Sequence, residues 1–151
     1  MDLTGRVAVV TGGASGIGAC SARAFSQKGA KVVVADLNGD GAKQVADEFG
    51  GLAIACDVGK ETDINQLVQQ CEQALGPIEI FFNNAAVATG GNPLDTPLEV
   101  WQEQWEINVM AHVYAVRAVL PGMLEREEGY LLHTASMAGI LTSQGNLTYA
   151  T

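Results

Sequence analysis

Short apolar runs alternate with stretches of helical periodicity along most of the chain. Five continuous apolar runs of strand length lie at residues 7–10, 31–35, 52–56, 78–82 and 130–134. The spacing between them predicts helices at 16–28, from the turn at 38–41 to residue 49, and at 61–75. Strands that alternate with helices and are apolar throughout are typical of parallel strands covered on both faces. We therefore expect an α/β fold with a doubly wound parallel sheet.

A longer helix is predicted after residue 96, where three signals of a helix start agree. Thr96 is a favoured N-cap residue, Pro97 suits the first helical position, and Glu99 lies three residues after the cap. Apolar positions then recur as far as residue 120, and Pro121 is expected to kink or end the helix.

Residues 11–18 read Thr-Gly-Gly-Ala-Ser-Gly-Ile-Gly, between the first predicted strand and the first predicted helix. A helix start leaves about four backbone N–H groups unpaired and carries roughly +0.5 charge, so it attracts phosphate. Gly12 suits a tight turn, Gly16 lets backbone approach a pyrophosphate, and Gly18 lets the helix pack closely on the strand. The spacing is not the commoner G-x-G-x-x-G, so a plain structural loop stays open as an alternative.

Polar residues also end the next strands, at the edge where a doubly wound sheet binds its ligands. Asp36 lies close to the offset from the glycines at which an acidic residue binds the adenosine ribose hydroxyls. A carboxylate there repels a 2′-phosphate, and Leu37 brings no compensating cation, so NAD is favoured over NADP. Asp57 ends the third strand and could accept from the adenine amino group while Val58 packs on the ring. The paired amides Asn83 and Asn84 end the fourth strand. A plain turn stays open as an alternative at both sites.

Composition narrows the class of protein. The chain has 151 residues, of which 48% are hydrophobic and 17% charged, so we expect one domain over residues 1–151. The net charge of −9 counts against nucleic acid or an anionic membrane surface as a partner. We find no signal-like start and no apolar run near the roughly 18 residues that span a bilayer, and we expect a cytoplasmic protein.

The remaining residue types of chemical interest are interpreted as structural. Cys20, Cys56 and Cys71 are odd in number and lack C-x-x-C spacing, so we expect small core residues, no disulfide framework and no metal site. The same holds for two pairs of larger side chains, which we expect to pack instead of binding a ligand: Trp101 with Trp105, and His112 with His133.

These features together resemble the short-chain dehydrogenase/reductase family over essentially the whole chain. The matching residues are Thr11-Gly12-x-x-x-Gly16-x-Gly18, Asp36, Asp57-Val58, Asn83-Asn84-Ala85, Asn108, Ser136 and Tyr149. Ala86 departs from the pattern, because the family usually has glycine there. The resemblance implies a Rossmann-type NAD(P)-binding domain whose cofactor contacts are Gly12, Ser15, Gly16, Ile17, Gly18, Asp36, Leu37, Asp57, Val58 and Asn84.

The resemblance also implies an activity, the NAD-dependent interconversion of a secondary alcohol and a ketone. Tyr149 would exchange a proton with the substrate oxygen while hydride moves to or from nicotinamide, and Ser136 would donate a hydrogen bond to that oxygen. Asn108, a poor helix former in mid-helix, would hold a water of the proton relay. A phenol has a pKa near 10, so the tyrosinate needs a nearby positive charge, which in the family comes from the oxidised nicotinamide and from a lysine at the position equivalent to 153.

The chain ends before that position, and we expect a partial sequence of a longer enzyme, truncated after the fifth strand. The full-length protein is expected to be a homo-oligomer that acts on a small-molecule alcohol or ketone, which the sequence does not identify. The alternative is a non-catalytic nucleotide-binding or interaction module, which the missing position 153 and an exposed edge of the sheet would both favour.

Overall fold

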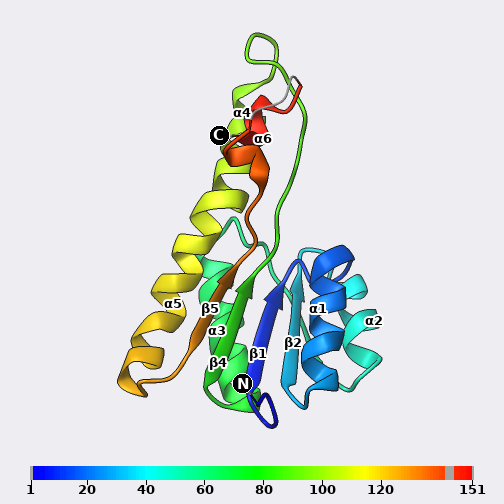
Figure 1. Ribbon diagram of the computed structural model, residues 1–151, viewed down its shortest axis with the longest axis vertical. Helices are drawn as coiled ribbons and strands as arrows, with labels where there is room; N and C mark the ends of the chain where they lie inside the picture. Colours follow the sequence, from blue (N-terminus) through cyan, green and yellow to red (C-terminus); the bar gives the residue numbers. More distant parts are fainter. Residues whose placement is uncertain (1, 142–144, 151) are drawn as a thin grey trace.

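The computed structural model describes residues 2–141 and 145–150, and five parallel strands form its single described sheet. The strands lie in the order β3-β2-β1-β4-β5. Figure 1 labels four of them, β2, β1, β4 and β5, side by side. Their bounds are β1 Val7–Thr11, β2 Lys31–Asp36, β3 Leu52–Ala55, β4 Ile78–Asn83 and β5 Tyr130–His133. The expected doubly wound α/β fold is therefore confirmed, and the strand order is that of the Rossmann type.

The order of the strands fixes where a ligand can bind. From β1 the chain adds β2 and β3 on one side of the sheet, and then crosses to add β4 and β5 on the other side. The carboxyl ends of β1 and β4 therefore flank the point at which the strand order reverses. Open parallel sheets bind their ligands in the crevice at this point.

Helices cover both faces of the sheet. Their bounds are α1 Gly16–Gln27, α2 Gly39–Asp47, α3 Glu61–Leu75, α4 Leu98–Trp105, η1 Glu106–Met110, α5 Ala111–Glu125, η2 Met137–Gly139 and α6 Leu147–Ala150. Successive strand residues point to opposite faces. Val10 and Val34 accordingly belong to the core with α1 and α2, whereas Val9 and Val33 belong to the core with α3 and α5.

The long helical run differs from the prediction at its start. α4 begins at Leu98, so Pro97 precedes the helix, and the Thr96 hydroxyl donates to the Asn92 carbonyl at 2.6 Å instead of capping the helix. The predicted Thr96 cap was therefore wrong. The hydroxyl stabilises a turn of the preceding loop, a role that residue type alone does not distinguish from capping.

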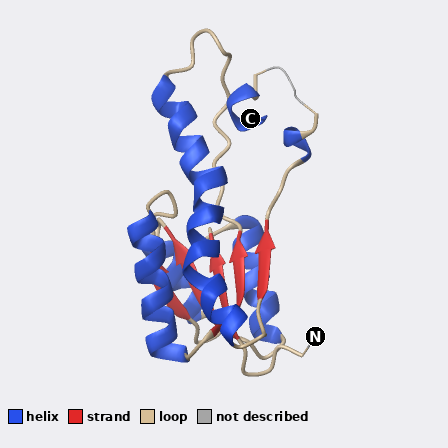
Figure 2. Ribbon diagram, turned by 90° about the vertical axis from the view of Figure 1, so that its left-hand side faces the viewer, coloured by secondary structure: helices blue, strands red, loops and turns tan. Residues whose placement is uncertain are grey.

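The run continues without a break as α4, the π-helical η1 and α5, and Pro121 lies inside α5 without ending it. By length and composition Leu98–Glu125 could cross a membrane, contrary to the expectation that no apolar run approaches that length. Ala111 and Ala115 pack this run into the core beneath the sheet, as in the core helix of a globular protein. Its α4 end and α6 extend together beyond the sheet (Figure 2).

The three cysteines divide into two classes. Cys56 and Cys71 are buried, as expected, and burial raises the pKa of both thiols to about 12. Cys20 is exposed on α1, so its assignment to the core was wrong. Among the residues that the structure describes, no cluster of three or more His, Cys, Asp or Glu side chains could hold a metal ion.

Candidate functional site

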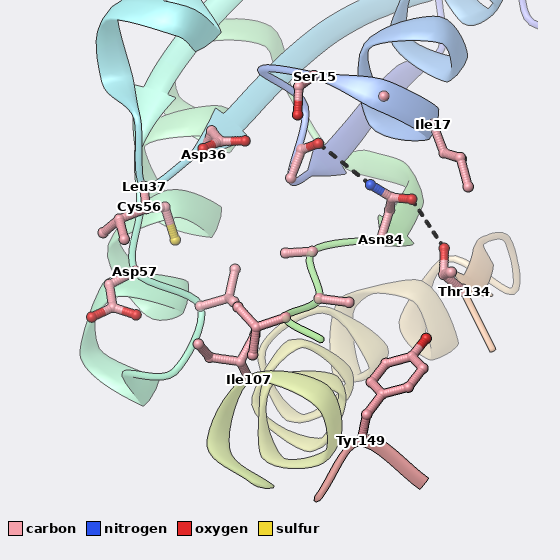
Figure 3. Close-up of a pocket in the computed structure, with 16 residues that line it drawn as sticks. Ser15, Ile17, Asp36, Leu37, Cys56, Asp57, Asn84, Ile107, Thr134 and Tyr149 are labelled. Atoms are coloured by element: carbon pink, nitrogen blue, oxygen red, sulfur yellow. Dashed lines mark hydrogen bonds between the residues drawn. The ribbon is translucent and has the colours of Figure 1, made fainter. Parts of the chain in front are cut away.

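A cavity of about 480 Å³ opens at the carboxyl edge of the sheet, at the point where the strand order reverses (Figure 3). Its volume lies in the range of pockets that bind small ligands and cofactors. It is lined by Gly12, Ser15, Gly16, Ile17, Asp36, Leu37, Cys56, Asp57, Val58, Asn84, Ala85, Ala86, Val87, Ile107, Thr134 and Tyr149. Nine of the ten predicted cofactor residues and one of the three predicted catalytic residues are in this set. Gly18, Asn108 and Ser136 are outside it.

Three glycines of the turn, Gly12, Gly16 and Gly18, differ in their surroundings. Gly12 has a φ of 64°, and a Cβ there would lie 2.8 Å from the Ala85 Cα, so the turn packs tightly on the chain after β4. A Cβ on Gly18 would lie 2.1 Å from the Gly12 carbonyl oxygen. Gly16 has a φ of 51° but faces open space. Gly12 and Gly18 therefore allow close packing, and Gly16 presents bare backbone to the cavity.

The start of α1 offers unpaired donors to the same cavity. Ser15 holds the N-cap position, but its side chain makes no capping hydrogen bond to the described helix. The first turn of α1 contains no carboxylate, whereas Asp40, Glu61 and Glu99 occupy the first turns of α2, α3 and α4. No carboxylate of its own first turn therefore compensates the partial positive charge of the α1 start, which favours an anionic ligand group.

Asp36 connects the end of β2 to the glycine turn. Its Oδ2 accepts from the Ala14 N–H at 3.0 Å, and its Oδ1 accepts from the Asn38 N–H at 2.9 Å. An ionised carboxylate has about four acceptor positions, so two further donors can bind. The carboxylate thus orders the turn and still offers acceptors to the cavity.

Asp57 supplies a second carboxylate at the end of β3. Its Oδ1 accepts from the Gly59 N–H at 3.1 Å, and its Oδ2 pairs with Lys60 Nζ at 2.9 Å. The hydrogen bond that Lys60 donates to the Asp57 carboxylate raises the pKa of Lys60. Lys60 itself is exposed and does not line the cavity, and neither does any other Lys, Arg or His of the described residues. Asp36 and Asp57 are the two charged side chains in the described wall.

Asn84 holds three strand ends together. Its backbone N–H donates to Thr11 Oγ1, its Nδ2 donates to the Thr11 carbonyl, both at 3.0 Å, and its Oδ1 accepts from Thr134 Oγ1 at 3.1 Å. The carboxyl ends of β1, β4 and β5 are thereby fixed around the cavity (Figure 3). Sequence analysis named Thr11 only as part of the glycine motif and gave Thr134 no role in the site, although a hydroxyl residue at the end of an apolar run was an available signal.

Asn108 lies in η1 and makes a paired contact with one residue. Its Oδ1 accepts from the Val87 N–H and its Nδ2 donates to the Val87 carbonyl, both at 2.9 Å. The side chain therefore positions the loop after β4, from which Val87 lines the cavity. One lone pair and one N–H of the amide are not used in this contact.

The structure separates the two remaining predicted catalytic residues. Tyr149 lies in α6 and lines the cavity, with its hydroxyl directed toward the side of Thr134 (Figure 3). Ser136 is exposed, caps η2 by accepting from the Ala138 N–H at 3.1 Å, and lines neither this cavity nor the second one described below. The structure therefore does not bring Ser136 and Tyr149 into one cavity.

The two histidines form a pair away from the cavity, in agreement with a structural role. The Nδ1 atoms of His112 and His133 lie 3.0 Å apart, and the rings stack with centroids 4.9 Å apart. Burial lowers the pKa of His112, and neighbouring His133 lowers it further.

A second cavity of about 490 Å³ lies beside the first. It is lined by Leu98, Trp101, Gln102, Gln104, Trp105, Asn108, Val109, Thr148 and Tyr149. Both tryptophans line this space and Trp105 is 50% exposed, so the expectation that they pack instead of binding a ligand stays a prediction.

A parallel sheet with a glycine turn and an acidic residue at its switch point defines a dinucleotide-binding Rossmann protein. Comparison with known families agrees: a model of the short chain dehydrogenase family matches residues 6–151. The chain belongs to the short-chain dehydrogenase family.

Individual relatives support this assignment. The chain is 38% identical to 1-deoxy-11-beta-hydroxypentalenate dehydrogenase of Streptomyces exfoliatus and 37% identical to 2,5-dichloro-2,5-cyclohexadiene-1,4-diol dehydrogenase of Sphingobium indicum, over 99% and 93% of its length. It spans 58% of the length of each. A short-chain dehydrogenase from Burkholderia phymatum, solved in complex with NAD, has a TM-score of 0.96 and 29% identity, covering 99% of this chain and 56% of that one.

Proposed function

We propose that the protein is an NAD-dependent oxidoreductase that interconverts a secondary alcohol and a ketone, with Tyr149 as the acid/base. The observation that carries the proposal is the position of Tyr149 on the wall of the cavity formed by the glycine turn, Asp36 and Asn84. A proton-transfer group must lie within reach of the atom it serves, and this cavity is where the cofactor would bind. Residues 1–151 form the NAD-binding domain in this proposal.

The wall of the cavity supports NAD as the cofactor. The start of α1, with Ser15, Gly16 and Gly18, would take the pyrophosphate, and the Asp36 carboxylate would accept from the adenosine ribose hydroxyls. Asp57 would accept from the adenine amino group. The same carboxylates disfavour a 2′-phosphate, because two like charges about 5 Å apart repel by about 3 kcal/mol at an effective dielectric constant of about 20.

Apolar and amide groups complete the proposed cofactor contacts. Leu37, which is 75% exposed, and Val58 would pack on the adenine, and Ile17, which is 64% exposed, would cover the far end of the cofactor. Burial of such exposed side chains by a ligand is favourable by about 25 cal/mol per Å². Asn84 would hold the backbone that receives the cofactor at the switch point.

Bound NAD would supply the hydride acceptor, and the residues of this chain would handle the proton. In the oxidising direction Tyr149 would act as the phenolate and take the proton of the substrate alcohol, and a nearby positive charge would stabilise that anion. In this proposal a lysine at position 153, where the family has one, would be a source of that positive charge. Ser136 uses its oxygen, not its proton, in capping η2, so its O–H could donate to the substrate oxygen after a local movement. The unused lone pair and N–H of Asn108 would hold a water of the relay.

The test is NADH formation by the intact protein with a panel of secondary alcohols. Tyr149→Phe should lose activity, because it keeps the ring and removes the proton-transfer group. Tyr130→Phe is the matched control, because Tyr130 lies exposed on β5 outside both cavities. Equal activity of Tyr149→Phe and the unsubstituted protein would refute the assignment.

A non-catalytic nucleotide-binding module is the second candidate, and the position of Ser136 outside both cavities favours it. Calorimetric titration separates the two, since NAD binding without NADH formation from any alcohol of the panel identifies the module. We also propose a cytoplasmic protein that forms a homo-oligomer. The exposed apolar side chains of Val113 and Leu124 along the helical run support the oligomer, and light scattering on the intact protein tests it.

A further inference from the structure

We propose that the second cavity binds the ring body of the substrate, and that Gln104 selects substrates that carry a second hydroxyl group. The inference rests on the proposed function, because it places the first hydroxyl of that substrate at Tyr149. It names a substrate class: a cyclic secondary alcohol with a further hydroxyl remote from the reacting carbon.

Tyr149 lies between the two cavities. Of the described residues, Tyr149 is the one that lines both cavities. Its ring therefore forms part of the boundary between the proposed cofactor cavity and the second cavity. A molecule held in the second cavity can present one end to the Tyr149 hydroxyl, on the side where the nicotinamide would lie.

The walls of the second cavity suit a ring. Leu98, Trp101, Trp105 and Val109 are spaced by three or four residues, so they lie on one face of the run formed by α4 and η1. Two indole faces and two aliphatic side chains offer flat apolar surface with little conformational freedom to lose. This surface favours a rigid alicyclic or aromatic body over a flexible polar chain.

Gln104 adds a specific polar requirement. The side chain is 2% exposed, and its Nε2 donates to the Thr89 carbonyl at 3.1 Å. Its Oε1 is buried and has no hydrogen-bond partner in the described part of the chain. A buried acceptor without a donor is unfavourable, so a ligand that brings a donor gains affinity there. An amide oxygen only accepts, so the ligand must supply an O–H or N–H group.

The other amide and hydroxyl side chains of this cavity each make a hydrogen bond. Thr148 Oγ1 donates to the Thr89 carbonyl at 2.6 Å, the Asn108 amide is paired with Val87, and Gln102 Nε2 donates to Glu106 Oε1 at 2.6 Å. Among the described residues of this wall, Gln104 Oε1 is the buried acceptor without a donor, and a ligand would complete it. With one hydroxyl at Tyr149 and a second at Gln104, the preferred substrate is a cyclic diol.

Tryptophan fluorescence tests the inference without NAD and without turnover, because both tryptophans of the chain line this cavity. The probes are decahydronaphthalene-1,5-diol and decahydronaphthalen-1-ol, which share a body and differ by one hydroxyl. We expect the Kd of the diol to be about tenfold lower, the usual value of one net hydrogen bond. The signal change should shrink in Trp105→Phe. Equal Kd values for the two probes, or no fluorescence change with either, would overturn the inference.

Three variants locate the preference at Gln104. Gln104→Met removes the acceptor at similar size and should bring the ratio of the two Kd values to about one, whereas Gln104→Glu keeps an acceptor and should retain the preference for the diol. Both also lose the bond to the Thr89 carbonyl. Thr148→Val is the matched control, because it removes the other donor to that carbonyl and should leave the ratio unchanged. Retention of the full preference in Gln104→Met would refute the role of Gln104.

The outcomes also separate this inference from the proposed function. Diol preference in the fluorescence titration together with no NADH formation from any alcohol would refute the proposed reaction and leave the diol pocket standing. NADH formation with equal affinity for the two probes would refute the diol pocket alone. Tyr149→Phe should retain the ratio of Kd values, because the second hydroxyl contacts Gln104.

Discussion

The cofactor preference provides the sharpest quantitative prediction, because it depends on two carboxylates in an otherwise uncharged wall. The double substitution Asp36→Ala with Leu37→Arg removes the carboxylate at the end of β2 and introduces a guanidinium beside it. We expect NADP affinity to rise relative to NAD affinity. The ratio of the two Kd values is the informative quantity, since both cofactors share every contact except the ribose 2′ position.

The magnitude follows from Coulomb repulsion between the Asp36 carboxylate and a 2′-phosphate, with a separation of about 5 Å assumed. Repulsion of about 3 kcal/mol per charge at about 5 Å is reduced by solvent at the open cavity to about 2 kcal/mol, which is about 30-fold in affinity. A charge-assisted pair of the guanidinium with the phosphate adds roughly a further tenfold. The ratio of the Kd for NAD to the Kd for NADP should therefore increase by more than about a hundredfold.

Part of the effect falls equally on both cofactors. Loss of Asp36 also removes the acceptors of the Ala14 and Asn38 N–H groups, so we expect the glycine turn to loosen and both affinities to fall. Calorimetric titration of the intact protein with each cofactor measures the ratio directly. Asp40→Asn is the matched control, because it removes an exposed carboxylate from the first turn of α2, outside the cavity. An unchanged ratio in the double variant would refute the electrostatic reasoning.

Three further predictions follow from single contacts. Gly18→Ala should lower the melting temperature far more than Gly16→Ala, because its Cβ would lie 2.1 Å from the Gly12 carbonyl oxygen, and equal effects in thermal melts would contradict this packing. Thr134→Val removes the donor to Asn84 Oδ1 and should raise the Kd for NAD about fivefold, as measured by calorimetry. An unchanged Kd would contradict the role of that bond in holding the strand ends. Because the pKa of His112 is lowered in the folded protein, the unfolded state binds more protons near that pKa. The unfolding free energy should therefore fall as the pH drops through the ordinary histidine range. His112→Phe should flatten this fall, as measured by denaturant titrations at about pH 7 and about pH 5.

Much of the fold could be predicted because its signals are local. The central strands are buried on both faces and therefore read as continuous apolar runs such as Val7–Thr11, and α3 lies at the predicted residues because Ile64, Leu67 and Cys71 face the core at helical spacing. The cofactor residues could be predicted for a related reason. Parallel strands bring their carboxyl ends to one edge, so residues that end successive strands converge.

The errors arose where a residue has alternative partners that depend on tertiary contacts. The Thr96 hydroxyl could cap α4 or close a turn, and in the structure it closes a turn by donating to the Asn92 carbonyl. Cys20 sits on the exposed side of α1, and the π-helical turn at Glu106–Met110 has no signal in the hydrophobic pattern. The spacing of residues along the sequence predicts which face of a helix a side chain lies on. It does not predict which other segment of the folded chain packs against that face.

The central claim is that Tyr149 transfers a proton at the cofactor cavity. The most direct measurement is NADH formation by Tyr149→Phe, with NAD binding measured calorimetrically on the same preparation. The account predicts a loss of activity of at least about a hundredfold with NAD affinity retained, because the substitution removes the hydroxyl and keeps the ring in the cavity wall. Full activity in Tyr149→Phe, with the same NAD affinity, would contradict it.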